Sequence, residues 1–424
     1  MRDRSMIQMP SCAHAHEEDG AAGRGCVAHG NAAARSHRSG LIAVVCSTVA
    51  VPQRVDNAVV GACEMIRDGR QRRDGVPRVT PGGCAVRARL TFLGAAAALA
   101  AIGGLPTGAS AASGLQGAGS SLVAPLIAEW SAAFTAFHGT SVSYYPIGAQ
   151  AAVNDISARA VDFAVSDTPM TPAQRTACNG CYQLPCALSG IAVGYHINGL
   201  GRHLYLNGKL LAQIYLGEIT RWNDPRIRAL NPNATLRDLR IVPIYSDASG
   251  STYTFTRYLS KVSAGWRQRI GYGSSVSFPT GVAANSIAAA AMLQSTNGSL
   301  AYVGAAYLIA NRLPAAAIEN SAGQFEYPNL SEIESAGRTV KHIGGSSSLE
   351  IVDPPRSARI AYPIATFSYL VVPANAPQKQ SLGEWISFVL GAGQAFGASL
   401  DYAALPPNVL SASNAAARQF NGSP

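Results

Sequence analysis

One stretch of the chain combines an apolar run, a polar turn and an amphipathic pattern. Residues 239–245 are largely apolar, residues 247–252 (Asp-Ala-Ser-Gly-Ser-Thr) are small or hydroxyl-bearing, and apolar residues then recur at helical spacing from Phe255. This order predicts a strand, a tight turn and the N-terminus of a helix. Because the first turn of a helix has unpaired N–H groups and the positive end of the dipole, the stretch can hold an anion. An ordinary helix N-cap is the alternative interpretation.

Two earlier stretches repeat this organisation. Residues 114–125 run from a short strand-like segment into a Gly/Ser turn, and apolar residues from Leu126 to Phe134 follow on one face of a predicted helix. Residues 160–169 predict a strand that ends in a carboxylate, Asp167. Repeated strand, turn and helix units predict an α/β fold with an open sheet. Such sheets bind ligands at the carboxyl ends of their strands.

Composition narrows the class of protein. The 424 residues are 48% hydrophobic and only 13% charged, with 42 Gly and 24 Pro, which suits a compact exported protein. The net charge of +9 comes mainly from arginines that precede residue 90. Beyond residue 111 the excess of basic residues falls to about four, and no basic cluster with interleaved aromatic residues remains. We therefore expect no nucleic-acid partner.

The N-terminal part needs separate treatment. Residues 1–85 contain most of the eight cysteines but no sustained periodicity, and we expect them to be a mis-called or disordered extension. Residues 86–111 combine Arg87 and Arg89, a short apolar segment and Ala-Ser-Ala, the layout of a secretory signal peptide. The apolar segment is too short for a stable membrane span. A soluble periplasmic protein is expected, and a long cytoplasmic tail before a signal anchor is the alternative.

Six motifs in a fixed order carry a family resemblance. They are Gly-Ala-Gly-Ser-Ser at 117–121, Asp-Phe-Ala-Val-Ser-Asp at 162–167, Ile-Tyr-Leu-Gly-Glu-Ile at 214–219, Asp-Ala-Ser-Gly-Ser-Thr at 247–252, Tyr-Pro-Ile at 362–364 and Leu-Asp-Tyr-Ala-Ala-Leu-Pro at 400–406. With these motifs, residues 114–410 resemble the periplasmic phosphate-binding proteins of bacterial phosphate ABC importers.

The resemblance implies a type 2 periplasmic-binding-protein fold. Each of its two lobes is a central mixed sheet flanked by helices, and two crossovers form the hinge. Lobe 1 would consist of residues 112–188 and 365–424, the latter ending in a loose tail from residue 411. Lobe 2 would consist of residues 189–364.

The resemblance also implies a ligand-binding set and no metal or cofactor. A carboxylate, Asp167, would accept a hydrogen bond from the protonated oxygen of phosphate, which lets the family reject sulfate. Hydroxyl and backbone donors would surround the other oxygens. The donors that match the family are Ser121 and Leu122 in lobe 1 and Ser249, Gly250 and Ser251 in lobe 2. A buried anion is tolerated when each oxygen meets a donor, and one acceptor selects a ligand that still bears a proton.

Two positions depart from the family pattern. Ala149 stands where the family usually has a serine, and Tyr245 stands where it has an arginine. Losing the bidentate, permanently charged arginine should lower phosphate affinity. Arg240 and Arg257 are interpreted as solvated surface charges rather than replacements. The site is then either a weakened phosphate site or a site for another small oxyanion or organophosphorus solute.

Other candidate chemistry is sparse. Cys178, Cys181 and Cys186 predict a disulfide in an exported protein, either Cys178 with Cys186 or Cys181 with Cys186, rather than a redox or metal site. The histidines are dispersed, so no metal site is expected. Ser249 lacks the first glycine of a Gly-x-Ser-x-Gly hydrolase motif, so we do not expect an enzyme.

Two functions follow from these observations. The first is a monomeric extracytoplasmic solute-binding protein that captures inorganic phosphate or a related oxyanion between two lobes. It would deliver this ligand to the permease subunits of an ABC importer. The second is an exported accessory or interaction protein on the same fold, with binding weakened or changed by Ala149 and Tyr245.

Overall fold

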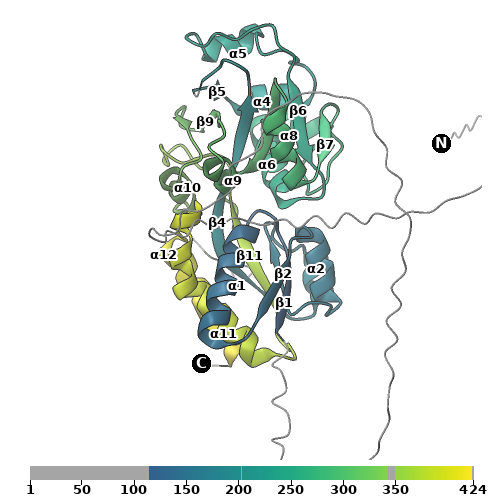
Figure 1. Ribbon diagram of the computed structural model, residues 1–424, viewed down its shortest axis with the longest axis vertical. Helices are drawn as coiled ribbons and strands as arrows, with labels where there is room; N and C mark the ends of the chain where they lie inside the picture. Colours follow the sequence, from purple (N-terminus) through teal and green to yellow (C-terminus); the bar gives the residue numbers. More distant parts are fainter. Residues whose placement is uncertain (1–113, 202, 342, 344–348, 423–424) are drawn as a thin grey trace, which may run out of the picture. The chain divides into compact units, whose positions relative to one another are not determined.

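The computed structural model describes residues 114–422, except residues 202, 342 and 344–348 (Figure 1). The extension expected at residues 1–85 and the signal peptide expected at residues 86–111 lie outside the described residues. No helix among the described residues is both long enough and apolar enough to cross a membrane.

An eight-stranded mixed sheet runs through the described chain in the order β2-β1-β3-β11-β4-β8-β6-β7. Its strands are β1 (Leu115–Gly119), β2 (Val142–Tyr145), β3 (Phe163–Ser166), β4 (Cys181–His196), β6 (Val242–Ser246), β7 (Val282–Ala284), β8 (Ser299–Gly304) and β11 (Ala365–Pro373). A small sheet contains β5 (Tyr205–Leu206), β9 (Ala317–Glu319) and β10 (Phe325–Glu326). Parallel pairs within each half and antiparallel β11 and β4 between them make the large sheet mixed.

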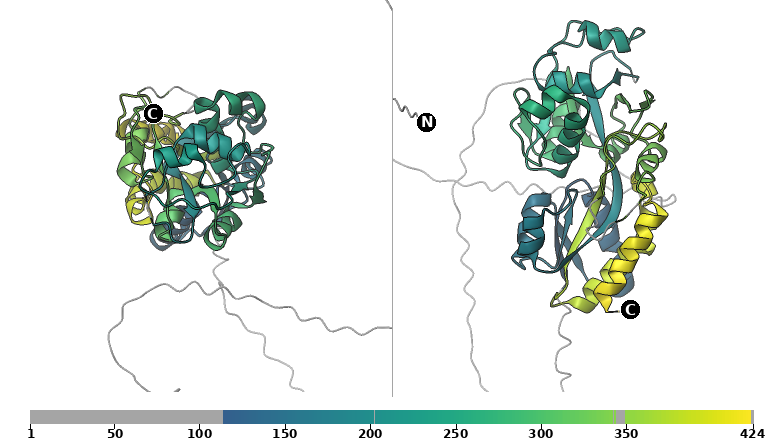
Figure 2. Two further views of the ribbon diagram at one scale, coloured as in Figure 1. Left: turned by 90° about the horizontal axis from the view of Figure 1, so that it is seen from above. Right: turned by 180° about the vertical axis from the view of Figure 1, so that it is seen from behind.

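The strand β4 divides this sheet into two lobes. Residues 181–190 of β4 pair with β11, whereas residues 191–196 pair with β8. The N–H of Ile191 donates to the carbonyl of Ile364 at 2.7 Å, so the two long strands are also joined where β4 changes partner. Strand β4 runs from one lobe into the other, and the chain returns to the first lobe at Ile364, directly before β11 (Figures 1 and 2). The expected α/β fold with two lobes and two crossovers is confirmed.

Helices cover the sheet in both lobes. Every residue of β11 is buried, as expected for a strand with packed faces on both sides. The helices are α1 (Ala124–His138), α2 (Ala149–Ser157), α3 (Pro172–Cys178), α4 (Gly208–Tyr215), α5 (Pro225–Leu230), α6 (Gly250–Val262), α7 (Ala264–Arg269), α8 (Ser286–Ser295), α9 (Ala305–Ala310), α10 (Leu330–Gly337), α11 (Lys379–Leu390) and α12 (Pro407–Asn421), with 3-10 turns at Ala392–Phe396 and Ala398–Leu400.

The loose tail expected from residue 411 is wrong for the described residues. Residues 411–421 continue α12, which lies along β4, and the Ser413 hydroxyl donates to the Pro185 carbonyl at 2.9 Å (Figures 1 and 2). Val409, Ser413 and Phe420 are buried on the face of α12 that packs against the lobe. This face was missed because small and polar residues separate its few apolar ones.

Candidate functional site

Three helix N-termini gather around the end of β3. The turn at residues 120–123 begins α1, Gly148 precedes α2, and Ser249 precedes α6 in the other lobe. The N–H of Gly148 donates to the Gly119 carbonyl at 2.9 Å, which fixes the first two turns together. Since each helix start has unpaired N–H groups and a positive dipole end, the arrangement attracts an anion without a cationic side chain.

Asp167 follows β3 at the centre of this arrangement. Its carboxylate is 2% exposed and accepts hydrogen bonds from Ser120 Oγ at 2.5 Å and Ser368 Oγ at 2.6 Å. Burial raises the pKa of Asp167 to about 6, and the two hydroxyl donors offset part of that rise. The carboxylate is therefore still charged near neutral pH, but it is protonated at a higher pH than an exposed aspartate would be.

The two lobes approach each other closely at small residues. A Cβ added to Gly250 of α6 would lie 2.3 Å from Oδ2 of Asp167, and one added to Gly304 would lie 2.6 Å from Leu122 Cδ1. Real Cβ atoms do not make such short contacts. Glycine at these two positions thus allows the start of α6 and the end of β8 to meet lobe 1.

The start of α6 is held by hydroxyl groups. Ser249 Oγ accepts the N–H of Thr252 at 3.1 Å, which is an N-cap, and lies 2.9 Å from Thr252 Oγ1. The Thr252 hydroxyl donates to the Ser246 carbonyl and lies 2.7 Å from the Tyr302 hydroxyl. Ala248 has φ 51°, a left-handed conformation that is unusual for a residue with a side chain. The turn is therefore a constrained structure.

A cavity of about 360 Å³ lies beside this turn. Ser121 and Leu122 line it from lobe 1, and Ser246, Ser251 and Tyr302 line it from lobe 2. Much of the remaining wall is apolar: Pro125, Ile287, Ala290, Val303, Ala306, Tyr307, Ala310 and Leu400. Its other lining residues are Ser286, Gly304, Asn311, Ser399, Asp401 and Tyr402.

Two hydroxyls in the cavity are unengaged. Ser251 is 8% exposed, and neither its hydroxyl nor that of Ser121 has a hydrogen-bond partner among the residues that the structure describes. Neither oxygen is among the fully buried unpaired atoms of the described residues, so both hydroxyls are open to the cavity and can donate to a ligand. None of the described residues that line the cavity is Lys, Arg or His.

The residues named from the sequence are brought to one region, but in different roles. Ser121, Leu122 and Ser251 line the cavity, and Gly250 touches Asp167 beside it. The N–H of Leu122 donates to Ser120 Oγ at 3.0 Å and is thus already engaged. Ser249 serves as the N-cap described above, the alternative that the sequence had left open.

Two site residues were missed in the sequence. Ser120 and Ser368 are 1% and 0% exposed, and both donate to Asp167. Ser120 lies within the Gly-Ala-Gly-Ser-Ser motif, and Ser368 interrupts the apolar run of β11. A serine within a strand of mostly apolar residues was the available signal, because a buried polar group needs a partner.

The two departing positions lie apart from the cavity wall. Ala149 is 1% exposed in the first turn of α2. Tyr245 stacks on Phe278 with ring centroids 4.3 Å apart, and its neighbour Ser246 lines the cavity. Successive residues of a strand point to opposite faces, so Tyr245 faces away from the cavity.

The two arginines considered as replacements also lie elsewhere. Arg257 pairs with Glu350 at 2.9 Å and lies over the Tyr272 ring at 4.3 Å, and Arg240 is exposed. Neither lines the cavity. Among the described residues, no group of three or more His, Cys, Asp or Glu could hold a metal ion.

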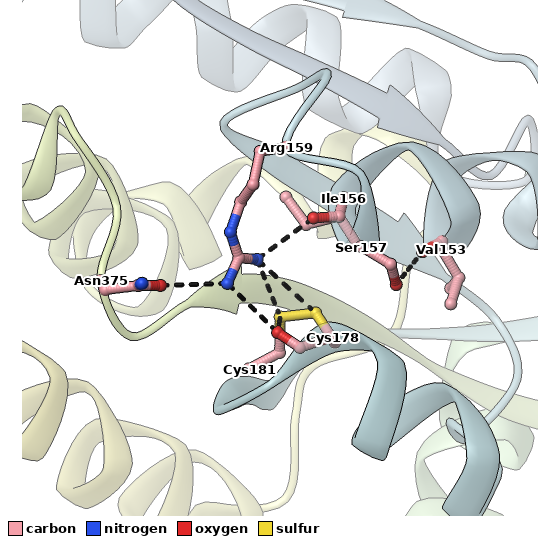
Figure 3. Close-up of a disulfide and its surroundings, with 7 residues drawn as sticks. All are labelled: Val153, Ile156, Ser157, Arg159, Cys178, Cys181 and Asn375. Carbon is pink, nitrogen blue, oxygen red and sulfur yellow. Dashed lines mark hydrogen bonds between the residues drawn. A yellow bond between two sulfur atoms is a disulfide. The ribbon is translucent and has the colours of Figure 1, made fainter.

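The disulfide differs from the expected pairings, both of which are wrong. Cys178 bonds to Cys181, and the buried Cys186 is free (Figure 3). Cys181 and Cys186 both lie in β4, where five residues span about 16 Å, too far for a bridge. The thiol of Cys186 instead contacts the carbonyl of Ser368 at 3.4 Å.

Arg159 surrounds this disulfide with further contacts. Its guanidinium donates to the carbonyls of Ile156 and Cys178, both at 3.2 Å, and to Asn375 Oδ1 at 3.0 Å (Figure 3). The arginine therefore joins the end of α2, the end of α3 and the segment after β11. The disulfide and its contacts thus connect three segments of lobe 1. None of these residues lines the cavity.

Comparisons with known proteins agree with this arrangement. Residues 106–392 match the family described as a PBP superfamily domain. A phosphate-binding protein PstS of Xylella fastidiosa is 33% identical over 303 residues, which cover 70% of this chain and 82% of the relative. A phosphate-binding protein PstS of Haemophilus influenzae is 32% identical over 308 residues, covering 71% and 91%. The crystal structure of a phosphate-binding protein from Stenotrophomonas maltophilia has a TM-score of 0.56 at 17% identity, covering 72% and 94%, and supports the fold alone.

Proposed function

The chain belongs to the PstS family of phosphate-binding proteins within the PBP superfamily, and on this premise we propose that it captures inorganic phosphate or a phosphate-like oxyanion between its two lobes. It acts as the solute-binding component of an ABC importer. In this role it binds and releases its ligand and catalyses no reaction. Phosphate is the partner that its relatives' names support.

The observation that carries the proposal is one buried acceptor among donors from both lobes. Asp167 takes the hydrogen bond of a protonated ligand oxygen, while Ser121 from lobe 1 and Ser251 with the first N–H groups of α6 donate to the others. Phosphate keeps a proton near neutral pH and sulfate does not, so Asp167 repels sulfate. A ligand held by both lobes favours the arrangement that a permease can recognise.

The lining also supports a second candidate. Because the described cavity-lining residues include no cation, the ligand's charge is met only by helix starts and hydroxyls, which bind more weakly than an arginine fork. This observation favours an exported accessory protein on the same fold, with weakened or changed ligand binding, as the alternative function.

Titration calorimetry separates the two functions. The purified protein is titrated with phosphate, arsenate and sulfate at neutral pH. Under the proposed function phosphate and arsenate bind, and sulfate binds at least about 100-fold more weakly because its fully ionised oxygens face Asp167. If none of the three anions releases heat at millimolar concentration, the accessory function takes its place.

The setting of this function is also part of the proposal. The protein is exported to the periplasm by the signal peptide of residues 86–111, works as a monomer and meets permease subunits of an importer. N-terminal sequencing of exported protein tests the first point, since a mature chain that still begins at residue 1 would contradict it. Light scattering of the same sample tests the second.

A further inference from the structure

We propose that the cavity beside the anion-binding turn holds an apolar substituent of the ligand, so that the preferred ligand is an organophosphorus anion such as a phosphonate. This inference rests on the proposed function, because it places the oxyanion head at Ser121, Ser251 and Asp167. It adds the chemical class of the group attached to that head.

The size of the cavity supports an organic group. Its volume of about 360 Å³ lies in the range of pockets for small organic ligands, roughly 300–1,000 Å³. A water molecule takes about 30 Å³ of liquid, so an inorganic anion at one end would leave room for several waters beside apolar walls. Filling that room with carbon atoms removes the unfavourable contact between water and apolar surface.

The composition of the walls supports the same class of ligand. Leu122, Ala290, Val303 and Leu400 give apolar surface from both lobes, whereas the unengaged hydroxyls of Ser121 and Ser251 mark the polar part. Mostly apolar walls with a few placed polar groups are typical of sites for organic ligands. The head group binds at the polar part and the substituent lies along the apolar walls.

The charges around the cavity limit the ligand further. The described lining residues include one carboxylate, Asp401, and no cation. A second anionic group on the substituent would therefore face a like charge and no counter-charge. Replacing one phosphate oxygen by carbon also reduces the number of donors that the site must supply, which suits a head group met by two hydroxyls and helix starts. The substituent is thus short, uncharged and aliphatic or aromatic.

A chain-length series tests this inference. Phosphate, methylphosphonate, ethylphosphonate and propylphosphonate share a tetrahedral head, and the three phosphonates differ only in apolar length. The affinity of the purified protein should rise about fourfold for each added methylene that is buried. Calorimetry measures the four affinities under one set of conditions.

Two variants fill the cavity from one wall. Ala306 of α9 is half-buried and Ala310 is exposed, and both line the cavity. Ala306→Phe should abolish the gain in affinity from methylphosphonate to propylphosphonate, because the ring occupies the space that the substituent would fill. Ala310→Phe is the second variant, in case the first does not fold. Ala291→Phe, on an exposed position of α8 outside the lining, is the matched control and should keep the gain.

The outcomes separate this inference from the proposed function. If phosphate binds but chain length gives no gain, or if both filling variants keep the gain, the inference fails and phosphate capture stands. If neither phosphate nor any phosphonate binds, both fail. A gain with length that disappears in the filling variants and persists in Ala291→Phe supports both.

Discussion

The polar groups that the two lobes contribute to the site differ in whether they already have hydrogen-bond partners. In lobe 1 both oxygens of Asp167 accept hydroxyl donors of the same lobe, and the N–H of Leu122 is also used. In lobe 2 the hydroxyl of Ser251 faces the cavity and has no partner among the described residues. Lobe 1 thus offers a fixed acceptor and the free hydroxyl of Ser121, whereas lobe 2 offers donors alone.

The supports behind these groups differ as well. The lobe 2 turn rests on Tyr302, whose ring stacks on Phe255 at 4.2 Å and whose hydroxyl accepts the N–H of Ser246 at 3.1 Å. The lobe 1 acceptor rests on two serine hydroxyls and on complete burial. An aromatic cluster is insensitive to pH, whereas a buried carboxylate is not. We therefore expect pH to change the stability of the lobe 1 site. We expect the distance between the two lobes to depend on the turn in lobe 2.

Asp167→Asn should have the largest effect. The substitution should change how the free energy of unfolding depends on pH. The pKa of Asp167 is raised from an ordinary 3.8 to about 6, so the folded state binds more protons than the unfolded state between these values. Stability from this group therefore falls as pH rises from about 4 to about 6, by about 3 kcal/mol in total. The asparagine variant should be more stable than wild type by about that amount at pH 8 and similar to it at pH 4.

Urea unfolding of both proteins at pH 4, 6 and 8 measures this difference. Other carboxylates titrate equally in the two proteins, so their contributions cancel in the comparison. A difference that is constant with pH would show that burial does not perturb Asp167. In the same variant the preference for phosphate over sulfate should shrink, because an amide can donate to a fully ionised oxygen.

Gly250→Ala should have the next largest effect, on ligand affinity. The added Cβ would lie 2.3 Å from Asp167 Oδ2, so the start of α6 must move away from lobe 1. Affinity for phosphate should fall about 100-fold, since overpacking of a close contact costs 1–3 kcal/mol. Gly265→Ala in α7 is the control, because an added Cβ there would come no closer than 4.0 Å to Ser263 Oγ. Calorimetry that finds equal phosphate affinities in the two variants would argue against lobe contact at Gly250.

Much of this architecture was predictable because its signals are local. Strand, turn and helix order at residues 114–125 and 247–252 predicted the α/β class, and the motif containing Asp167 placed a carboxylate at a strand end. Such signals depend on spacing within about ten residues, where periodicity and capping chemistry decide the structure. Ser121 and Ser251 were named as ligand donors because each follows directly on a turn; both line the cavity, and their role as donors stays a prediction.

The remaining features depend on contacts between distant segments. Ser368 reaches Asp167 only because β11 lies antiparallel to β3. The disulfide depends on a turn in which Asn179 and Gly180 both have positive φ, which brings the Cα atoms of Cys178 and Cys181 to 5.6 Å. Cysteine spacing alone does not report that turn, and a choice among three cysteines therefore stayed open.

The smallest expected effects are those of replacing two serines at the start of α6, one of which should change ligand affinity and the other stability. Ser251→Ala should lower phosphate affinity about tenfold with little change in unfolding free energy, because its hydroxyl has no partner in the described chain and is free to donate to a charged oxygen. Ser249→Ala should instead cost about 1 kcal/mol of stability through the lost N-cap, with a smaller effect on affinity. Calorimetry and urea unfolding of both variants test the contrast. If Ser249→Ala lost the more affinity and Ser251→Ala the more stability, the donor that lobe 2 offers would be the capping hydroxyl rather than the one that faces the cavity.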